Sequence, residues 1–330
     1  MRDRTRADNY PTYRQRRAGR WSCRPHRPNQ RIAVNVTSTG QRPRRRLPAL
    51  TCLPALAAAL ALAGCALGPV TPLAPDTAAR LPPVRFLLTF DDGPDTGPYG
   101  GTPLILRQLA DNPLAPGIKA IFFVQTEHPR RGGGSEGRAQ MRETCAQGQL
   151  MAVHSGMKAG HVPHTRLAPD VLAASLRRGQ GDIAAQCGQA LAVVRPPNWA
   201  YSPATQAVYA QVGLGMLMAD ANARDGKFYG WTISLRRRPH MRHELEQVGR
   251  AMAAHRLPAV DGVTPVIVAF HDPNGFTASR MTEYLQILVE TARDNGLPLA
   301  DPPFYTDTQA AGRAALARAA AGVYARDHWP

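Results

Sequence analysis

Two adjacent carboxylates, Asp91 and Asp92, follow a run of apolar residues and precede a Gly-Pro pair. The apolar run, residues 84–88, has the composition of a buried strand, and Gly93-Pro94 is expected to end it. The two acids therefore stand at the carboxyl end of a strand, where α/β folds hold their chemistry. Acids in this position can bind a metal ion or activate water, although Asp before Gly-Pro also suits an ordinary turn.

Four further predicted strands end in polar residues. Residues 150–153 lead to His154, 191–194 to Arg195, 214–218 to Asp220, and 266–270 to His271. Each of these side chains alone also has a structural interpretation, as a core histidine or an ion-paired group. Carboxylate, imidazole and guanidinium groups that meet at one edge of a sheet are instead typical of an active site.

The elements that must position these residues alternate between strand and helix. Helix-like runs cover residues 104–110, 135–147, 168–186, 203–212, 241–255 and 278–295, and a further Ala-rich helix is expected over 309–321. Repeated strand–helix units predict a mainly parallel sheet, either a barrel or a doubly wound layer.

These motifs, in this order, resemble the polysaccharide deacetylase family of metal-dependent carbohydrate esterases. The segment 89–94 matches the family's first motif without a mismatch, 195–197 matches its third, and 270–272 resembles its last. The resemblance covers about residues 84–300 and implies an α/β fold, a distorted (β/α) barrel. It also implies hydrolytic removal of N-acetyl or O-acetyl groups from a polysaccharide.

The resemblance implies a divalent metal held by Asp92, His154 and a second histidine. Zinc is the expected ion, with cobalt or another divalent metal as the alternative. The family places the second histidine four residues after the first, whereas here His161 follows after seven. The residues after His161 fit the family's continuation, so we expect His161 to be the ligand across a three-residue insertion, with His164 as its rival.

The same resemblance assigns the proton transfers. Asp91 would deprotonate water, and Arg195 would keep Asp91 ionised and oriented. His271 would protonate the departing amine, assisted by an acid from the family's fourth motif. That motif is altered here and offers two acids, Asp220 and Asp225. We expect Asp220, because it is nearer to its strand.

The segment after Arg195 would bind the substrate. The backbone N–H of Asn198 is expected to stabilise the oxyanion. Trp199 and Tyr201 offer a surface on which a sugar could stack, with loop packing as the alternative interpretation.

The positive charge gathers near the N-terminus. Of the formal net charge of +16, residues 1–64 carry +12, from 14 Arg and two Asp. The remainder is close to the charge of an ordinary globular domain, so the sequence does not predict a nucleic-acid partner. The five cysteines form no CxxC pair, which argues against a thiolate zinc site. Cys145 and Cys187 are expected to form a disulfide in an oxidising compartment or to remain two buried thiols.

The N-terminal segment has the order of a lipoprotein signal peptide. Residues 44–46 are basic, 53–62 are apolar, and 62–65 resemble a bacterial lipobox that ends in Cys65. A diacylated Cys65 would anchor the protein without spanning the membrane. Ala66 after the cysteine resembles sorting to the outer membrane, so we expect an exported protein of the outer membrane or periplasm of a diderm bacterium.

The predicted organisation has four parts. A basic leader with its signal peptide covers 1–64, a Pro-rich tether 65–83, the catalytic domain 84–300, and a partly helical tail 301–330. Residues 1–46 show no apolar periodicity, and a true start of the protein near Val34 is the alternative to a basic leader that begins at residue 1.

Two other functions fit parts of the sequence. An inactive carbohydrate-binding lipoprotein would explain the altered second and fourth motifs, and a hydrolase of a small non-sugar amide is a related enzymatic alternative. The retained acids, Arg195 and His271, favour an enzyme. The sequence does not determine the oligomeric state.

Overall fold

The computed structural model describes residues 70–97, 101–225 and 236–326. The predicted leader, signal peptide and Cys65 lie outside these residues. In the part that is described, no helix is both long enough and apolar enough to cross a membrane.

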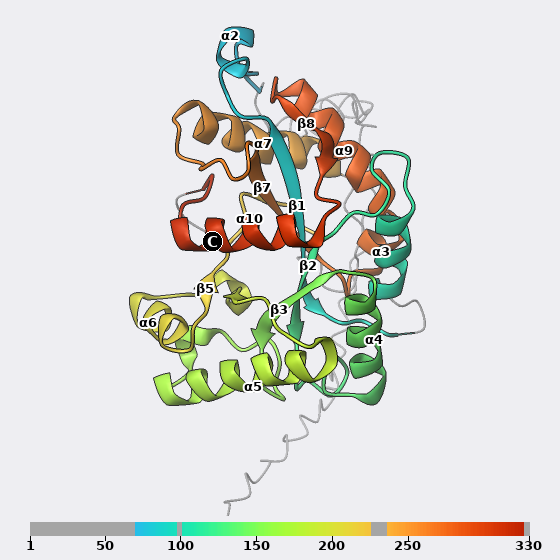
Figure 1. Ribbon diagram of the computed structural model, residues 1–330, viewed down its shortest axis with the longest axis vertical. Helices are drawn as coiled ribbons and strands as arrows, with labels where there is room; N and C mark the ends of the chain where they lie inside the picture. Colours follow the sequence, from blue (N-terminus) through green and yellow to red (C-terminus); the bar gives the residue numbers. More distant parts are fainter. Residues whose placement is uncertain (1–69, 98–100, 226–235, 327–330) are drawn as a thin grey trace, which may run out of the picture. The chain divides into compact units, whose positions relative to one another are not determined.

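In the described residues, eight parallel strands form one curled sheet in the order β5-β4-β3-β2-β1-β7-β6, and β8 pairs with β1 beside this path (Figure 1). The strands are β1 (Val84–Gly93), β2 (Ile121–Gln125), β3 (Leu150–Ser155), β4 (Val193–Val194), β5 (Gly215–Met216), β6 (Ala221–Asn222), β7 (Thr264–His271) and β8 (Leu299–Phe304). Among these residues no ladder joins β5 to β6. The predicted α/β fold, a distorted (β/α) barrel, is therefore confirmed, and in the described residues the barrel is open between β5 and β6.

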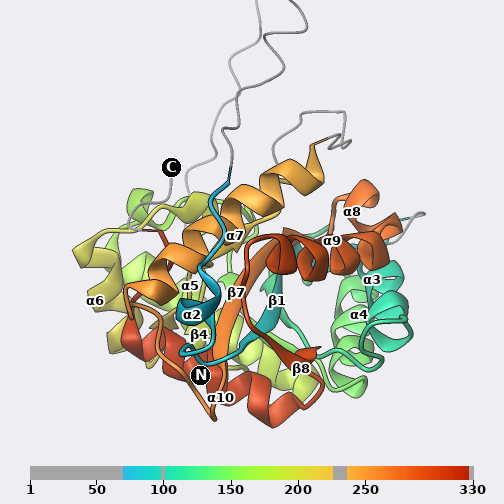
Figure 2. The same ribbon diagram turned by 90° about the horizontal axis from the view of Figure 1, so that it is seen from above.

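Helices surround this sheet, with β1 and β7 near the centre (Figure 2). They are α2 (Pro75–Ala78), α3 (Gly101–Ala110), α4 (Ser135–Ala146), α5 (Pro169–Cys187), α6 (Pro203–Gln211), α7 (Arg237–Ala253), α8 (Gly275–Ser279), α9 (Met281–Asp294) and α10 (Thr308–Ala321). Two 3₁₀ turns, η1 (His164–Arg166) and η2 (Pro197–Trp199), complete the described elements. The predicted helices are confirmed to within a few residues, except that the run 278–295 is broken at Arg280 into α8 and α9.

β1 contributes to two separate cores because its side chains alternate between the faces of the sheet. Phe86, Leu88 and Phe90 pack with the apolar faces of the surrounding helices. Leu87 packs with the second apolar cluster, on the concave face. The same two-residue period carries Asp91 to the concave face, where it is buried.

α10, which lies beyond residue 300 in the predicted tail, closes the concave face of the sheet. Its alanines, such as Ala311 and Ala315, pack in the concave cluster. A Cβ on Gly215 would lie 2.9 Å from the Cβ of Ala319, so only small residues allow this approach. β8 spans the predicted boundary and pairs with β1. Residues 301–321 therefore belong to the same folded unit as the catalytic strands.

The end of the predicted tether also packs on the domain. The Leu73 amide donates to the Asn295 carbonyl at 2.9 Å. The Leu73 side chain packs against the core beside Leu297, where a Cβ on Gly249 would lie 3.5 Å from both side chains. The Pro-rich composition, from which we predicted a tether, therefore did not indicate that this segment packs on the domain.

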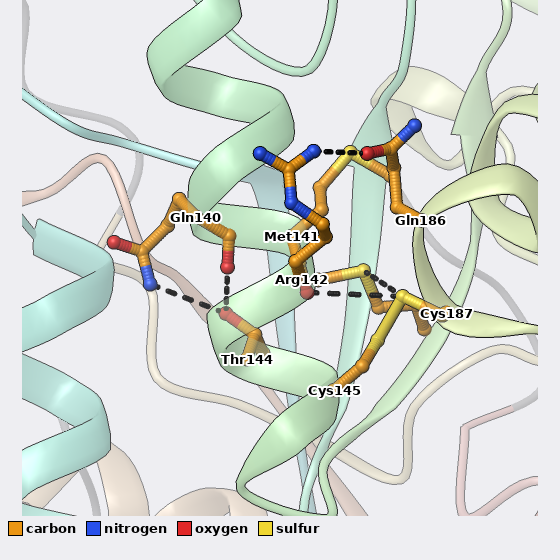
Figure 3. The surroundings of a disulfide bond; sticks show 8 residues. Gln140, Met141, Arg142, Thr144, Cys145, Gln186 and Cys187 are labelled. Carbon is orange, nitrogen blue, oxygen red and sulfur yellow. Dashed lines mark hydrogen bonds between the residues drawn. A yellow bond between two sulfur atoms is a disulfide. The ribbon is translucent and has the colours of Figure 1, made fainter.

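Cys145 on α4 and Cys187 at the end of α5 form a disulfide (Figure 3). Their Cα atoms are 5.6 Å apart, and 42 residues separate them in the sequence. Beside them, Arg142 donates to Gln186 at 2.5 Å. Of the two states that the sequence left open, the structure has the disulfide.

Replacing both cysteines by serine is expected to destabilise the fold by about 2–4 kcal/mol, because the unfolded chain regains the entropy of the closed loop. For a domain of this size, this corresponds to a Tm lower by roughly 5–15 °C in a thermal unfolding scan. The reductant dithiothreitol should lower the Tm of the wild type alone. An equal effect on the double variant would contradict this assignment.

Candidate active site

The backbone at the end of β1 turns both adjacent carboxylates into one pocket. In a regular strand Asp91 and Asp92 would point to opposite faces. Here the pairing of β1 with β2 shifts register between Asp91 and Gly93, and Asp92 has φ 76°. Both acids consequently line a cavity of about 670 Å³.

Gly93 is required at this bend because a buried carboxyl group lies against it. A Cβ on Gly93 would lie 2.0 Å from Oδ2 of Asp272. That oxygen accepts a hydrogen bond from Thr102 at 2.5 Å. Burial raises the pKa of Asp272 to about 7. The first and last sequence motifs are thus packed directly on each other.

The predicted ligands Asp92, His154 and His161 lie together, with one donor atom of each within 4.8 Å of the others. Nε2 of His154 is 3.2 Å from Oδ1 of Asp92, and Nε2 of His161 is 3.3 Å from the same oxygen. His154 is buried, whereas 38% of the His161 side chain is exposed. The seven-residue spacing does not prevent the predicted grouping.

The hydrogen bonds of His154 favour a bound cation. Its Nδ1 lies 2.8 Å from the carbonyl oxygen of Arg195. A carbonyl only accepts, so Nδ1 must carry a proton, and Nε2 is the ring nitrogen available to bind a cation. This buried Nε2 has no hydrogen-bond partner in the described residues and faces the Asp92 carboxylate. Two electron-rich atoms in this arrangement fit a divalent ion between them.

The electrostatics keep Asp92 ionised. Burial alone would raise the pKa of its carboxyl group, but the electrostatic effect of the neighbouring imidazoles, His154 foremost and then His271 and His161, outweighs burial and holds this pKa well below its usual value. Asp92 therefore offers an anionic oxygen to a cation.

A glycine-containing loop brings His161 to the cluster. Gly160 has φ 69°, in the left-handed region that favours glycine. A Cβ on Gly160 would lie 2.2 Å from Oε1 of Gln125. The predicted insertion is thus accommodated by close backbone packing against β2.

The rival histidine, His164, has a different environment. Its Nδ1 forms a 2.8 Å hydrogen bond with the hydroxyl group of Tyr209, and the side chain is buried. Burial, assisted by the charge of His154, lowers the pKa of His164 to about 3. His164 is not part of the Asp92 cluster.

Gln125 contributes to the site although it belongs to no recognised sequence motif. At the end of β2, its amide donates to Oδ1 of Asp92 at 2.9 Å. This contact orients the carboxylate that both histidines face. The only signal for it in the sequence is its place directly after the mostly apolar run of residues 118–124.

The predicted Arg195–Asp91 pair is present and buried. Nη1 of Arg195 lies 2.9 Å from Oδ1 of Asp91 and 2.6 Å from the hydroxyl group of Thr89. Its Nε donates to the Leu217 carbonyl, and the guanidinium lies over the ring of Phe123 at 4.3 Å. Removing either charge would leave the other buried and unpaired, which costs about 3–5 kcal/mol.

The acid beside His271 is Asp225, so the expectation of Asp220 is wrong. Nδ1 of His271 lies 2.7 Å from Oδ1 of Asp225, and the His271 amide donates to Oδ2 at 3.0 Å. The hydroxyl group of Thr277 donates to the same Oδ2 at 2.8 Å. Burial would lower the pKa of His271, but Asp225, with smaller contributions from the pocket acids, raises it to about 10.

Asp220 is instead a structural group on the closed side of the sheet. It pairs with Arg318 of α10 at 2.8 Å, and both side chains are fully buried. Its carboxylate also accepts from the amides of Ile267 and Ala325, each at 2.9 Å. Nearness to a strand in the sequence was misleading because β6 intervenes and carries Asp225 to the end of β7.

The predicted substrate residues occupy two environments. Asn198 and Trp199 line the cavity, with φ 58° and 57°. The guanidinium of Arg195 lies 5.2 Å from the Trp199 ring centre. Tyr201 is 39% exposed and is not among the described residues that line the cavity. The oxyanion role of Asn198 stays a prediction.

Comparison with known proteins supports the family resemblance. The family model for polysaccharide deacetylase matches residues 79–217. This span contains the three clustered ligands and the Arg195–Asp91 pair, and it ends before Asp225 and His271. A search of curated proteins found no match.

A search of solved structures also found similar proteins, and the first of the three below has a similar fold. A chitin deacetylase from the fungal pathogen Colletotrichum lindemuthianum has a TM-score of 0.52 and 20% identity, covering 79% of this chain and 99% of its own. A family 4 carbohydrate esterase from Streptomyces lividans in complex with acetate has a TM-score of 0.45 and 22% identity, covering 65% and 91%. A family 4 acetyl xylan esterase from Clostridium thermocellum in complex with a cobalt ion has a TM-score of 0.43 and 20% identity, covering 68% of this chain and 95% of its own.

The two histidines should differ in metal binding. His161→Ala removes one of three clustered donors and is expected to weaken zinc affinity roughly 100-fold or more. His164→Ala is expected to keep one metal per chain and to lower only the Tm, since His164 is buried on Tyr209. Elemental analysis after dialysis and a zinc competition titration measure both. Metal loss in the His164 variant alone would overturn the assignment.

Asp225→Asn should change the pH dependence of catalysis. The carboxylate stabilises protonated His271, so its removal lowers the pKa of His271 from about 10 toward or below 6.5. The alkaline limb of kcat/KM is expected to move to lower pH, and the rate at pH 8 should fall by about 10²–10⁴-fold. Asp111→Asn, an exposed carboxylate on another surface, is the control. An unmoved limb would exclude this role.

Proposed function

We propose that this chain, whose residues 79–217 belong to the polysaccharide deacetylase family, removes acetyl groups from a polysaccharide by metal-dependent hydrolysis. One observation carries the proposal: a cluster of metal donors shares a cavity with a base held by arginine and an acid held by carboxylate. A protein that only binds sugar has no use for such a base and acid. The arrangement therefore favours an enzyme over the inactive binding protein.

Asp92, His154 and His161 would hold the metal. Two imidazoles and one carboxylate suit zinc, and also cobalt or a related first-row ion. When bound, such an ion lowers the pKa of water and polarises a carbonyl group. Gln125 supports this set by fixing the orientation of Asp92.

Asp91 would take the proton from the attacking water. Its Oδ1 is occupied by Arg195, which leaves Oδ2 to accept the proton. The buried guanidinium stabilises the ionised form and prevents the side chain from rotating. Because Asp91 is almost fully buried, its position is set before the substrate enters.

His271 would give a proton to the departing group. A pKa of about 10 keeps its imidazole protonated at neutral pH. Asp225 accepts from Nδ1, so Nε2 is left to donate to the amine or alcohol. After that transfer, the paired carboxylate favours the return of a proton to the ring.

Asn198 and Trp199 would position the acetylated sugar. The backbone N–H of Asn198 is proposed to donate to the oxyanion, and the Trp199 ring to contact the sugar face. Both residues line the cavity beside the metal cluster. Tyr201 would contact the polymer only beyond the cavity.

The protein is further proposed to work outside the cytoplasm, anchored through a lipidated Cys65. The basic and apolar segments before Cys65 support export. The Cys145–Cys187 disulfide is compatible with an oxidising compartment such as the periplasm.

Acetate release from acetylated glycans tests the activity. The purified domain with zinc should release acetate from N-acetylglucosamine oligomers or acetylated xylan, and a chelator should abolish the release reversibly. Asp91→Asn is expected to lower kcat by about 10²–10⁴-fold with the metal still bound. Undiminished acetate release by this variant would rule out Asp91 as the base. Sugar binding by a metal-free, inactive wild type would favour the binding-protein alternative.

A further inference from the structure

One loop outside the catalytic groups lines the cavity with arginine. It comprises residues 128–134, between β2 and α4, and is called the rim loop. Its sequence is His-Pro-Arg-Arg-Gly-Gly-Gly. His128, Arg130 and Arg131 of this loop line the same cavity as the metal donors.

The three glycines make the rim loop compact. A Cβ on Gly133 would lie 2.4 Å from the Glu127 carbonyl oxygen, and a Cβ on Gly134 would lie 2.7 Å from that of Pro129. The Gly132 amide donates to the Gln125 carbonyl at 3.1 Å. The loop is thus folded back on the end of β2, and the two arginines project from a defined backbone.

The two arginines have different surroundings. Arg131 is fixed by Asp95 at 2.5 Å. Arg130 is exposed, and no carboxylate among the described residues pairs with its side chain. Both arginines also line a second hollow of about 410 Å³, so the rim loop separates this hollow from the catalytic cavity.

The acids of the catalytic cavity do not neutralise Arg130, because each already has a partner. Asp91 pairs with Arg195, Asp225 pairs with His271, and Asp92 belongs to the metal cluster. Glu136 lines only the second hollow.

Arg224 also lines the cavity, but it lies 3.4 Å from Glu244 and offers no carboxylate to Arg130. Among the described residues, the catalytic cavity therefore presents at its rim a guanidinium that no carboxylate pairs with.

From this geometry we propose that Arg130 binds a carboxylate on the polysaccharide. A guanidinium matches a carboxylate with two parallel hydrogen bonds, and the rigid loop reduces the entropy cost of that contact. The inference rests on the proposed deacetylase function and narrows its substrate to an acidic glycan. The reacting acetyl group lies at the metal cluster, whereas Arg130 lies at the boundary with the second hollow. The carboxylate consequently belongs to a neighbouring sugar unit, either a uronic acid or a sugar with a lactyl ether.

Arg130→Gln tests the inference through substrate selectivity. The substrates are a neutral N-acetylglucosamine oligomer, an oligomer of alternating N-acetylglucosamine and glucuronic acid, and glycan strands with free lactyl carboxylates. KM for a carboxylate substrate is expected to rise about 10-fold or more, with kcat little changed. KM for the neutral oligomer should not change. Comparison of the two acidic substrates identifies the source of the carboxylate.

Arg107→Gln is the matched control, because Arg107 is also exposed but lies on α3 and lines neither hollow. Raising the salt concentration should weaken binding of the acidic substrate to the wild type more than its binding to Arg130→Gln. Equal changes of KM on neutral and acidic substrates would overturn the inference.

Direct binding separates this inference from the proposed activity. In the Asp91→Asn background, calorimetry should show tighter binding of an acidic oligomer than of the neutral one, and Arg130→Gln should remove the difference. Without such a difference the carboxylate site is wrong, even if acetate is released. If binding discriminates but no glycan releases acetate, the carboxylate site stands and the deacetylase function is wrong.

Discussion

The buried guanidinium of Arg195 is the interaction on which the rest of the site depends. Its side chain holds Asp91, while its backbone carbonyl determines that Nδ1 of His154 carries a proton and leaves Nε2 for the metal. The proposed base and one proposed metal ligand are therefore positioned by the same residue. The full burial of this charge is possible because a carboxylate, a hydroxyl group and two backbone carbonyls satisfy it within the concave core.

The concave core needs a cover to keep that charge away from water. α10 is this cover. Its small side chains pack closely on the sheet, and the buried Arg318–Asp220 ion pair holds the helix in place. A helix without evident chemistry in its sequence thus maintains the low-dielectric environment in which Arg195 and Asp91 attract strongly. The contribution of α10 to the site is indirect but electrostatic in origin.

The two carboxylates that end β1 have different partners. Asp91 pairs with the arginine, whereas the histidines beside Asp92 keep the pKa of its carboxyl group low. The bend at Asp92 separates these environments within two consecutive residues, and Gly93 permits the bend because Asp272 leaves no room for a side chain. A third carboxylate, Asp225, keeps His271 protonated. The cavity therefore contains a proton acceptor and a proton donor at the same pH.

The sequence by itself determined the features that depend on local order. Apolar runs and their polar ends predicted the parallel strands, the helices, and the positions of Asp91, Asp92, His154, Arg195 and His271. The residues that follow His161 also predicted its place in the cluster despite the longer spacing from His154. These features could be predicted because strand period, turn residues and motif order are properties of short segments.

Only the tertiary structure decided which distant groups meet. It showed that Asp225, and not Asp220, is the acid that pairs with His271. It also showed that His164 is hydrogen-bonded to Tyr209 and that Gln125 contacts Asp92 of the cluster. It also joined Cys145 to Cys187 and brought residues 299–321 into the sheet and its concave core. The physical reason is that an ion pair or ligand set depends on the spatial distance between strand ends. That distance follows from the curl of the sheet and the short β6, and neither leaves a recognisable pattern in the sequence.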